Sequence, residues 1–177
     1  MCITRHTTHR LHEFTFAYTV RHKARGHAGR LTCVDKANVF RSQAFFLQIF
    51  DDVKAGHPEI EACYSYVDAM ALDMVRRPWD YDVMVMENMF GDILSDLAGG
   101  LVGGMGMASC AEVGDEHALF QPAHGSAPDI MGQDKANPLA AILSGALMLD
   151  YLSDRTGGHT GLADAAQVIE DAVEKGF

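Results

Sequence analysis

The sequence predicts an α/β fold in which helices flank a layered sheet. Short apolar stretches with strand-like patterns alternate along the chain with longer stretches. In the longer stretches the apolar residues recur at helical spacing. The composition is globular, with 48% hydrophobic and 21% charged residues, and 177 residues are enough to bury a sizeable core. Strands that alternate with helices are typical of layered α/β architectures.

The first expected element is a helix at 7–25, because apolar residues such as Leu11 and Phe14 recur there at helical spacing. Thr7 or Thr8 is the expected N-cap of this helix, since a threonine hydroxyl can accept a bond from the first free N–H groups. Two glycines follow the pattern and are expected to end the helix.

A short strand is expected at 31–34, where the sequence LTCV is mostly apolar. The polar turn 35–38 leads into a helix that runs through 45–53, where Phe and Ile have helical spacing, and Gly-His-Pro at 56–58 stops it. Residues 61–66 alternate like a second strand.

A helix is expected at 67–76 and ends before Pro78. The continuous apolar run YDVMVM at 81–86 is typical of a buried strand, and a helix follows at 91–101 until a run of glycines breaks it.

Residues 120–129 are expected to be mostly loop. Asn-Pro starts a long apolar helix at 137–152, and 163–175 forms the last helix.

Charge and composition exclude several classes of protein. The net charge of −10 argues against a nucleic-acid partner, which needs a basic face. No apolar run approaches the roughly 20 residues that span a bilayer, so no membrane association is expected. The four cysteines have wide, irregular spacings, which argues against a disulfide framework or a structural zinc site and favours a cytoplasmic location. The basic first 30 residues are interpreted as a solvated helix face.

Two carboxylates in FGDILSD are the first candidates for chemistry. A spacing of four places Asp92 and Asp96 on one helical face, about 6 Å apart at Cβ. A hard divalent cation such as Mg²⁺ or Mn²⁺ would relieve their repulsion, because it prefers oxygen ligands. The alternative is a solvated acidic face.

Further candidates follow the first two expected strands. Asp68, in YVDAMALDMV, could be an N-cap or a third oxygen ligand of the same metal. Lys36, in VDKANVF, could be a surface charge paired with Asp35 or a partly desolvated amine suited to proton transfer. Asn38 lies two residues beyond Lys36 and would face the same way on an extended turn.

A loop of small residues is the fourth candidate. HGSAPDI, at 124–130, would let a ligand approach the backbone closely, and Asp129 could accept hydrogen bonds from ribose hydroxyls, which favours NAD over NADP. The alternative is an ordinary turn-rich loop. The glycine run at 99–106 lacks the Lys-Ser or Lys-Thr of a phosphate-binding loop, and the remaining histidines show no metal-ligand spacing.

Taken together, these segments resemble one family. VDKANVFRS, YVDAMALDMV, ENMFGDILSDLAGGLVGGMGMA, HGSAPDIMGQDKANPLAAILSGALML and AAQVIEDAV occur in the order expected of the isocitrate/isopropylmalate dehydrogenases, the metal-dependent β-decarboxylating dehydrogenases. The similarity extends from Thr4 to the end of the chain.

The resemblance implies roles for the candidate residues. Lys36 is similar to the family's catalytic general base and acid, which reaches into the partner subunit's site. Asp68 is similar to a metal ligand donated across the dimer, and Asp92 and Asp96 are similar to the ligands of the resident subunit. Asn38 resembles a residue near the nicotinamide. The implied adenosine-binding residues are His124, Gly125, Ser126, Ala127, Asp129, Ile130 and Asn137.

The resemblance also implies an incomplete architecture. Residues 1–100 would be part of an inner dimerising domain, and 101–177 part of an outer cofactor-binding domain. The family's N-terminal half, with its substrate-binding Arg cluster and catalytic Tyr, is not matched. Tyr18 lies inside the first expected helix and is not assigned that role.

The implied reaction is NAD- and Mg²⁺- or Mn²⁺-dependent oxidative decarboxylation of a small 2R-malate-type 2-hydroxy acid, foremost 3-isopropylmalate. The alternatives are a tartrate/D-malate- or isocitrate-dehydrogenase-like enzyme, or a non-catalytic dimerisation module or pseudoenzyme. The expected partner is a second copy of the chain or a complementary N-terminal half.

Overall fold

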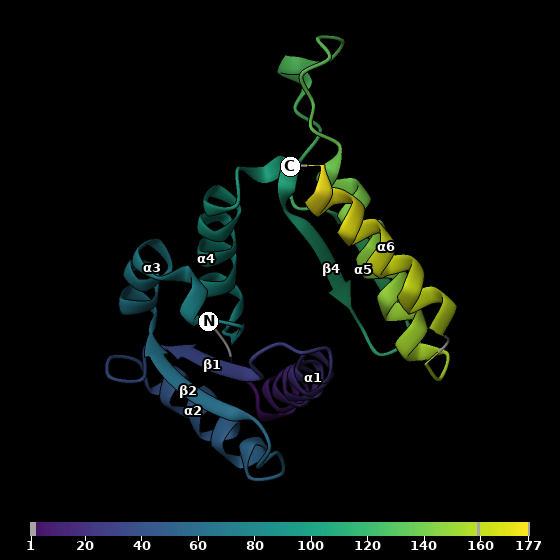
Figure 1. Cartoon of the computed structure of the whole chain (residues 1–177). Coiled ribbons are helices and arrows are strands. Elements are labelled where there is room, and N and C mark those ends of the chain that lie inside the picture. Colours follow the sequence, from purple (N-terminus) through teal and green to yellow (C-terminus); the bar gives the residue numbers. More distant parts are fainter. Residues whose placement is uncertain (1–2, 159, 177) are drawn as a thin grey trace. The chain divides into compact units, whose positions relative to one another are not determined.

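The computed structural model describes residues 3–158 and 160–176, so Cys2 lies outside the described residues. The chain divides into two compact units, Met1–Ser95 and Asp96–Phe177. Figure 1 shows the elements of the first unit in purple to teal and those of the second in green to yellow. The roles predicted for the two parts of the chain, dimerising and cofactor-binding, stay predictions.

The first unit is built around a parallel three-stranded sheet in the order β2-β1-β3. Helices alternate with its strands, so the predicted α/β class is confirmed. Its elements are α1 (Arg5–Ala24), β1 (Arg30–Asp35), α2 (Arg41–Lys54), β2 (Glu61–Tyr66), α3 (Val67–Arg76), the 3₁₀ turn η1 (Pro78–Asp80), β3 (Val83–Val85) and the start of α4 (Asn88–Leu101).

The core of this unit lies between β1 and the two long helices. Leu31 and Cys33 on β1 are fully buried, as are Phe16 on α1 and Phe50 on α2. The Phe16 and Phe50 ring centroids are 5.1 Å apart, which places the two helices side by side. The central strand is buried on both faces, which explains why its sequence is a continuous apolar run rather than an alternating one.

Helix α1 corrects two details of the sequence prediction. Thr4 caps its N-terminus, accepting a bond from Thr7 N, so Thr7 and Thr8 are not the cap. The predicted apolar face is wrong as well, because Leu11 and Phe14 are exposed. The buried residues are Thr8, His12, Thr15, Phe16 and Thr19. The threonine hydroxyls at 15 and 19 donate to carbonyls one turn back, which allows a polar face to be buried without leaving those donors unpaired.

The second unit combines a two-stranded antiparallel sheet with a helical hairpin. Its elements are the end of α4, the 3₁₀ turn η2 (Met105–Met107), β4 (Ser109–Val113), β5 (Ala118–Pro122), the 3₁₀ turn η3 (Pro128–Ile130), α5 (Leu139–Arg155) and α6 (Thr160–Lys175). Helix α5 contacts both strands and packs along α6 (Figure 1).

The β4–β5 hairpin is a correction, since no strand was expected at 109–113 and 120–129 was expected to be mostly loop. SCAEV has a weak strand signal, and ALFQP ends in proline, so neither segment shows a clear strand pattern. Pairing of the two strands and their contact with α5 stabilise the extended conformation, which the local strand propensity of these segments only weakly favours. No helix among the described residues is long and apolar enough to cross a membrane. The cytoplasmic location stays a prediction.

Candidate active site

The carboxyl ends of β1 and β2 bring the first two candidate residues together. The strands run parallel with Asp35 opposite Tyr66, so they end at the same level. Lys36 follows β1 directly, and Asp68 lies in the first turn of α3, which follows β2 directly. Lys36 Nζ donates a hydrogen bond to Asp68 Oδ1 and forms an ion pair with it. The sheet edge therefore creates a contact between residues that are far apart in the sequence.

The two side chains of the Lys36–Asp68 pair differ in solvent exposure. The Lys36 side chain is 20% exposed, whereas the Asp68 side chain is 69% exposed. The hydrogen bond from Lys36 is the main cause that holds the pKa of the Asp68 carboxyl below its usual value. Lys36 Nζ also lies 5.5 Å from the centroid of the Tyr66 ring, within the range of a cation–π contact. The amine is thus held in place while the carboxylate remains open to a ligand.

Two details of this arrangement bear on the alternatives that the sequence left open. Lys36 pairs with Asp68 rather than with Asp35. Asp68 is not the N-cap of α3, because the cap residue is Tyr66 and the cap has no side-chain hydrogen bond. Asp68 does lie in the first helical turn, where the helix dipole favours a negative charge.

Asp35 positions the turn that carries Lys36, a role that sequence reasoning missed. Its side chain is buried, and Oδ1 accepts a 2.7 Å bond from Ala37 N. Burial raises the pKa of this carboxyl, and the bond from Ala37 opposes that effect. The signal in the sequence is an acidic residue at the end of an apolar strand, followed by a turn.

Asp92 and Asp96 both lie on α4, one turn apart, as predicted. Both side chains are exposed. Among the described residues, neither carboxylate has a hydrogen-bond or ion-pair partner. Carboxylate oxygens are the donors that Mg²⁺ and Mn²⁺ prefer.

Glu87 fixes the start of α4 and was also missed. Its buried carboxylate accepts bonds from Met89 N at 3.2 Å and Phe90 N at 3.3 Å, which satisfies two of the free N–H groups of the helix. Because β3 runs parallel to β1, α4 leaves the sheet from the same edge as Lys36 and α3. This edge is where ligands bind in open α/β sheets.

The predicted adenosine-binding loop connects β5 to α5 in the second unit. Residues 123–129 are exposed, and Ala127 has a φ of 42°, in the left-handed region that non-glycine residues seldom adopt. The His124 ring nitrogen Nδ1 is hydrogen-bonded to Gly125 O at 2.7 Å, and Ile130 N donates to Ala127 O. The loop therefore has a defined conformation with accessible backbone and side chains.

Asn137 lies at the other end of this connection. Its Oδ1 accepts a 3.0 Å bond from Leu139 N at the start of α5. Gly106 on η2 approaches it so closely that an added Cβ would come within 2.9 Å of Asn137 Cβ. Asn38, by contrast, is exposed in the turn after Lys36 in the first unit, and the structure shows no contact that tests its predicted role.

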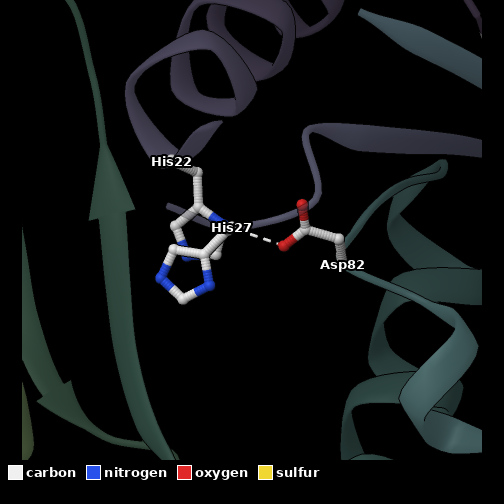
Figure 2. A group of neighbouring side chains, drawn as sticks. All are labelled: His22, His27 and Asp82. Atoms are coloured by element: carbon white, nitrogen blue, oxygen red, sulfur yellow. Dashed lines mark hydrogen bonds and ion pairs between the residues drawn. The ribbon is translucent and has the colours of Figure 1, made fainter. Parts of the chain in front are cut away.

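A third group of side chains lies at the opposite end of β1. His22 at the end of α1, His27 in the following loop and Asp82 before β3 come together in the first unit, as Figure 2 shows. Sequence reasoning found no metal-ligand spacing among the histidines, and the structure adds Asp82 from a distant segment of the chain. Burial opposes ionisation of Asp82, but bonds from Gly29 N, Arg30 N and His22 outweigh it and hold the pKa of this carboxyl below its usual value.

A family model described as isocitrate/isopropylmalate dehydrogenase matches residues 1–177, the full length of the chain. The chain belongs to the isocitrate/isopropylmalate dehydrogenase family. This confirms the family that the sequence motifs suggested, and it is a family of oxidoreductases.

Several relatives in this family are similar over the whole chain. A 3-isopropylmalate dehydrogenase of Chlorobaculum tepidum is 42% identical over 177 residues, which are 100% of this chain and 48% of the relative. A 3-isopropylmalate/3-methylmalate dehydrogenase of Methanocaldococcus jannaschii is 44% identical over 174 residues, 98% of this chain and 50% of the relative. The crystal structure of isocitrate dehydrogenase from Methylococcus capsulatus superposes with a TM-score of 0.86 at 40% identity, covering 98% of this chain and 48% of that one.

The chain thus spans about half the length of the curated relatives it matches. The relatives also carry different substrate names at similar identity, since a homoisocitrate dehydrogenase of Methanocaldococcus jannaschii is 44% identical over 157 residues, 88% of this chain and 44% of the relative.

Proposed function

We propose that this chain takes part in the NAD- and Mg²⁺- or Mn²⁺-dependent oxidative decarboxylation of a 2R-malate-type 2-hydroxy acid, with 3-isopropylmalate as the first candidate substrate. The observation that carries this proposal is the Lys36–Asp68 contact at the carboxyl edge of the sheet, in a chain of the dehydrogenase family. It joins a candidate proton acceptor to a candidate metal ligand.

Lys36 carries the proton chemistry in this proposal. In its neutral form, Nζ accepts the proton of the substrate 2-hydroxyl while the C2 hydrogen leaves as hydride, which gives a 2-oxo acid. Loss of CO₂ then leaves an enolate, and a returned proton at the enol carbon completes the reaction. NAD would serve as the hydride acceptor. The contact with Asp68 holds Nζ at a defined place, and the pair remains accessible through the exposed carboxylate.

Asp92 and Asp96 are the residues that would hold the divalent ion, with Asp68 supplied from a second subunit. A bound ion would polarise the 2-oxygen and stabilise negative charge that develops there. The two α4 carboxylates support this role because they are exposed, one turn apart and without partners among the described residues.

The loop between β5 and α5 is proposed to bind the adenosine part of NAD. His124, Asp129 and Asn137 offer polar side chains there, and the small residues between them leave room for a ligand. Asn38 is proposed to contact the nicotinamide from the turn after β1. The Asp129 carboxylate is the reason to expect NAD rather than NADP, because it is placed to accept hydrogen bonds from ribose hydroxyls in this proposal.

A second subunit is part of the proposal, either another copy of this chain or a complementary N-terminal half. On α3, Leu72 is 55% and Val75 58% exposed, and on α4 Ile93 is 60% exposed. These exposed apolar side chains are the candidates for an interaction surface. A second candidate function is a non-catalytic dimerisation module that supplies Lys36 and Asp68 to another subunit, and the accessible Lys36–Asp68 pair supports it.

NADH formation by the purified chain tests the proposal. The reaction contains Mn²⁺ and either 3-isopropylmalate, D-malate, tartrate or isocitrate. Asp92→Asn removes one carboxylate of the proposed metal pair, and Asp164→Asn on α6 is the matched control. We expect Asp92→Asn to abolish NADH formation and Asp164→Asn to leave it unchanged.

A second arm mixes the chain with a full-length relative whose own catalytic lysine has been substituted. NADH formed only in the mixture supports the module that acts in trans. No NADH in either arm, from a folded chain, contradicts both an enzyme made of copies of this chain and the module that acts in trans.

A further inference from the structure

The group of His22, His27 and Asp82 lies apart from the carboxyl edge that carries Lys36 and Asp68. Each residue offers one ligand atom, and these atoms lie within 4.8 Å of one another. The residues come from three separate places in the chain: the last turn of α1, the α1–β1 loop and the residue that precedes β3. Folding of the first unit alone is therefore enough to assemble the group.

Asp82 is firmly held. Its Oδ2 accepts bonds from Gly29 N at 2.7 Å and Arg30 N at 3.3 Å, while Oδ1 lies 2.8 Å from His22 Nδ1 (Figure 2). A carboxylate hydrogen-bonded to a histidine orients the ring, and an ion bound between Asp82 Oδ1 and His22 Nδ1 would take the place of the proton that they share. The His22 ring is thus positioned before any ligand arrives.

His27 completes the group from the solvent side. Its ring stacks on His22 with 3.6 Å between centroids and an interplanar angle of 4°, and the residue is exposed. It lies in a loop bracketed by Gly26 and Gly29, which have φ values of 95° and 69°. Ligand atoms around a tetrahedral ion are about 3.4 Å apart at bond lengths near 2.1 Å. Parallel imidazole rings direct their nitrogen lone pairs side by side, so the exposed His27 ring would turn out of the stack to share one ion with His22.

We propose that His22, His27 and Asp82 form a binding site for a transition-metal ion of the Zn²⁺, Co²⁺ or Ni²⁺ class. Two imidazoles and a carboxylate suit these ions, whereas Mg²⁺ and Mn²⁺ prefer the all-oxygen donors of Asp92 and Asp96. The two sites thus differ in donor chemistry, and the proposed histidine site does not depend on the proposed catalytic function.

Titration of the full-length, chelator-treated chain with Co²⁺ tests the proposal. Excess Mg²⁺ is present throughout to fill the all-oxygen site, and visible absorption reports coordination. We expect one Co²⁺ per chain with bands of nitrogen and oxygen coordination. His27→Gln should weaken Co²⁺ binding about tenfold or more, because it removes a ligand from an exposed position without disturbing the core.

The matched control is His6→Gln. It changes an exposed histidine on α1, away from the proposed site, and should leave Co²⁺ affinity unchanged. Asp92→Asn should also leave it unchanged, which separates this site from the proposed catalytic one. Equal Co²⁺ affinity in the wild-type and His27→Gln chains would overturn the proposal, as would a thiolate charge-transfer band, which would place the ion on a cysteine.

Discussion

At the residue scale, the unexpected feature is a buried histidine inside the first helix. His12 is fully buried, and its Nε2 lies 3.2 Å from Phe46 O. Its ring meets Phe46 and Phe50 edge-on, and Nδ1 has no partner among the described residues. Burial is the main cause that lowers the pKa of His12 to about 4 from its ordinary 6.5, although the bond to Phe46 O opposes this. The residue behaves as part of the apolar core.

Because the pKa of the buried His12 ring is low, we expect the chain to lose stability in mild acid. Below pH 6.5 the unfolded chain binds a proton on this ring, whereas the folded chain does so only near pH 4. Stability is therefore complete above pH 6.5 and falls between pH 6.5 and 4, by roughly 3 kcal/mol of free energy of unfolding in all. Urea unfolding across this range measures the effect.

In that experiment, His12→Phe removes the titrating ring and should flatten the pH dependence, while His6→Gln serves as a control that should not. An unchanged slope in the His12→Phe chain would show that other groups cause the acid sensitivity.

Lys36 gives the second prediction at this scale. Lys36→Met removes both the proposed proton acceptor and the partner of Asp68, so turnover in any active assembly should fall by about 10²–10⁴-fold. The pKa of Asp68, measured by NMR, should rise because its main stabilising hydrogen bond is lost.

Lys36→Arg keeps the positive charge but cannot serve as a base, so it should preserve the low pKa of Asp68 without restoring turnover. Lys175→Met removes an exposed lysine on α6 and is the control, which should change neither turnover nor the pKa of Asp68. Wild-type turnover in the Lys36→Arg chain would contradict a proton-transfer role.

At the element scale, the candidate residues of each unit lie beside short segments that follow strands or precede helices. Asp35 organises the turn after β1, Glu87 starts α4, and Asn137 lies at the start of α5. In the second unit the turn η2 lies against Asn137, where Gly106 leaves no room for a side chain. The position of the proposed NAD loop thus depends on a close contact between two short elements.

Gly106→Ala tests that contact. The new Cβ would clash with Asn137 Cβ at 2.9 Å, so we expect a loss of about 1–3 kcal/mol of stability and weaker NAD binding. Gly145→Ala, in open space on α5, is the matched control and should stabilise the chain by about 0.5–1 kcal/mol, as expected for a helix interior. Urea unfolding and NAD titration measure both effects, and an unperturbed Gly106→Ala chain would mean that Asn137 moves freely.

At the scale of the whole molecule, the chain comprises two units, and the first carries exposed apolar side chains on α3 and α4. The formal charge of −10 opposes nonspecific self-association, so any stable association needs a specific apolar contact. The exposed α3 residues Leu72 and Val75 are the candidates for that contact.

Val75→Glu should weaken association of the chain, because it places a charge in a desolvated contact. Sedimentation velocity on the wild-type and variant chains at several concentrations measures the change. Val168→Glu, a similarly exposed valine on α6, is the control and should leave association unchanged. A wild-type chain that stays monomeric at all concentrations, or a Val75→Glu chain that associates equally well, would contradict the prediction.

The sequence by itself determined the family, the α/β class and the position of most helices and strands, because their periodicities are local and the motifs are contiguous. It also identified Lys36, Asp68, Asp92 and Asp96 as candidate residues.

Only the tertiary structure decided which side chains meet. The register of β1 with β2 pairs Lys36 with Asp68 rather than with Asp35, and packing against α2 buries His12 in place of Leu11. The β4–β5 hairpin and the His22–His27–Asp82 group also depend on contacts between distant segments. Such contacts depend on packing and strand register, which local sequence patterns do not encode.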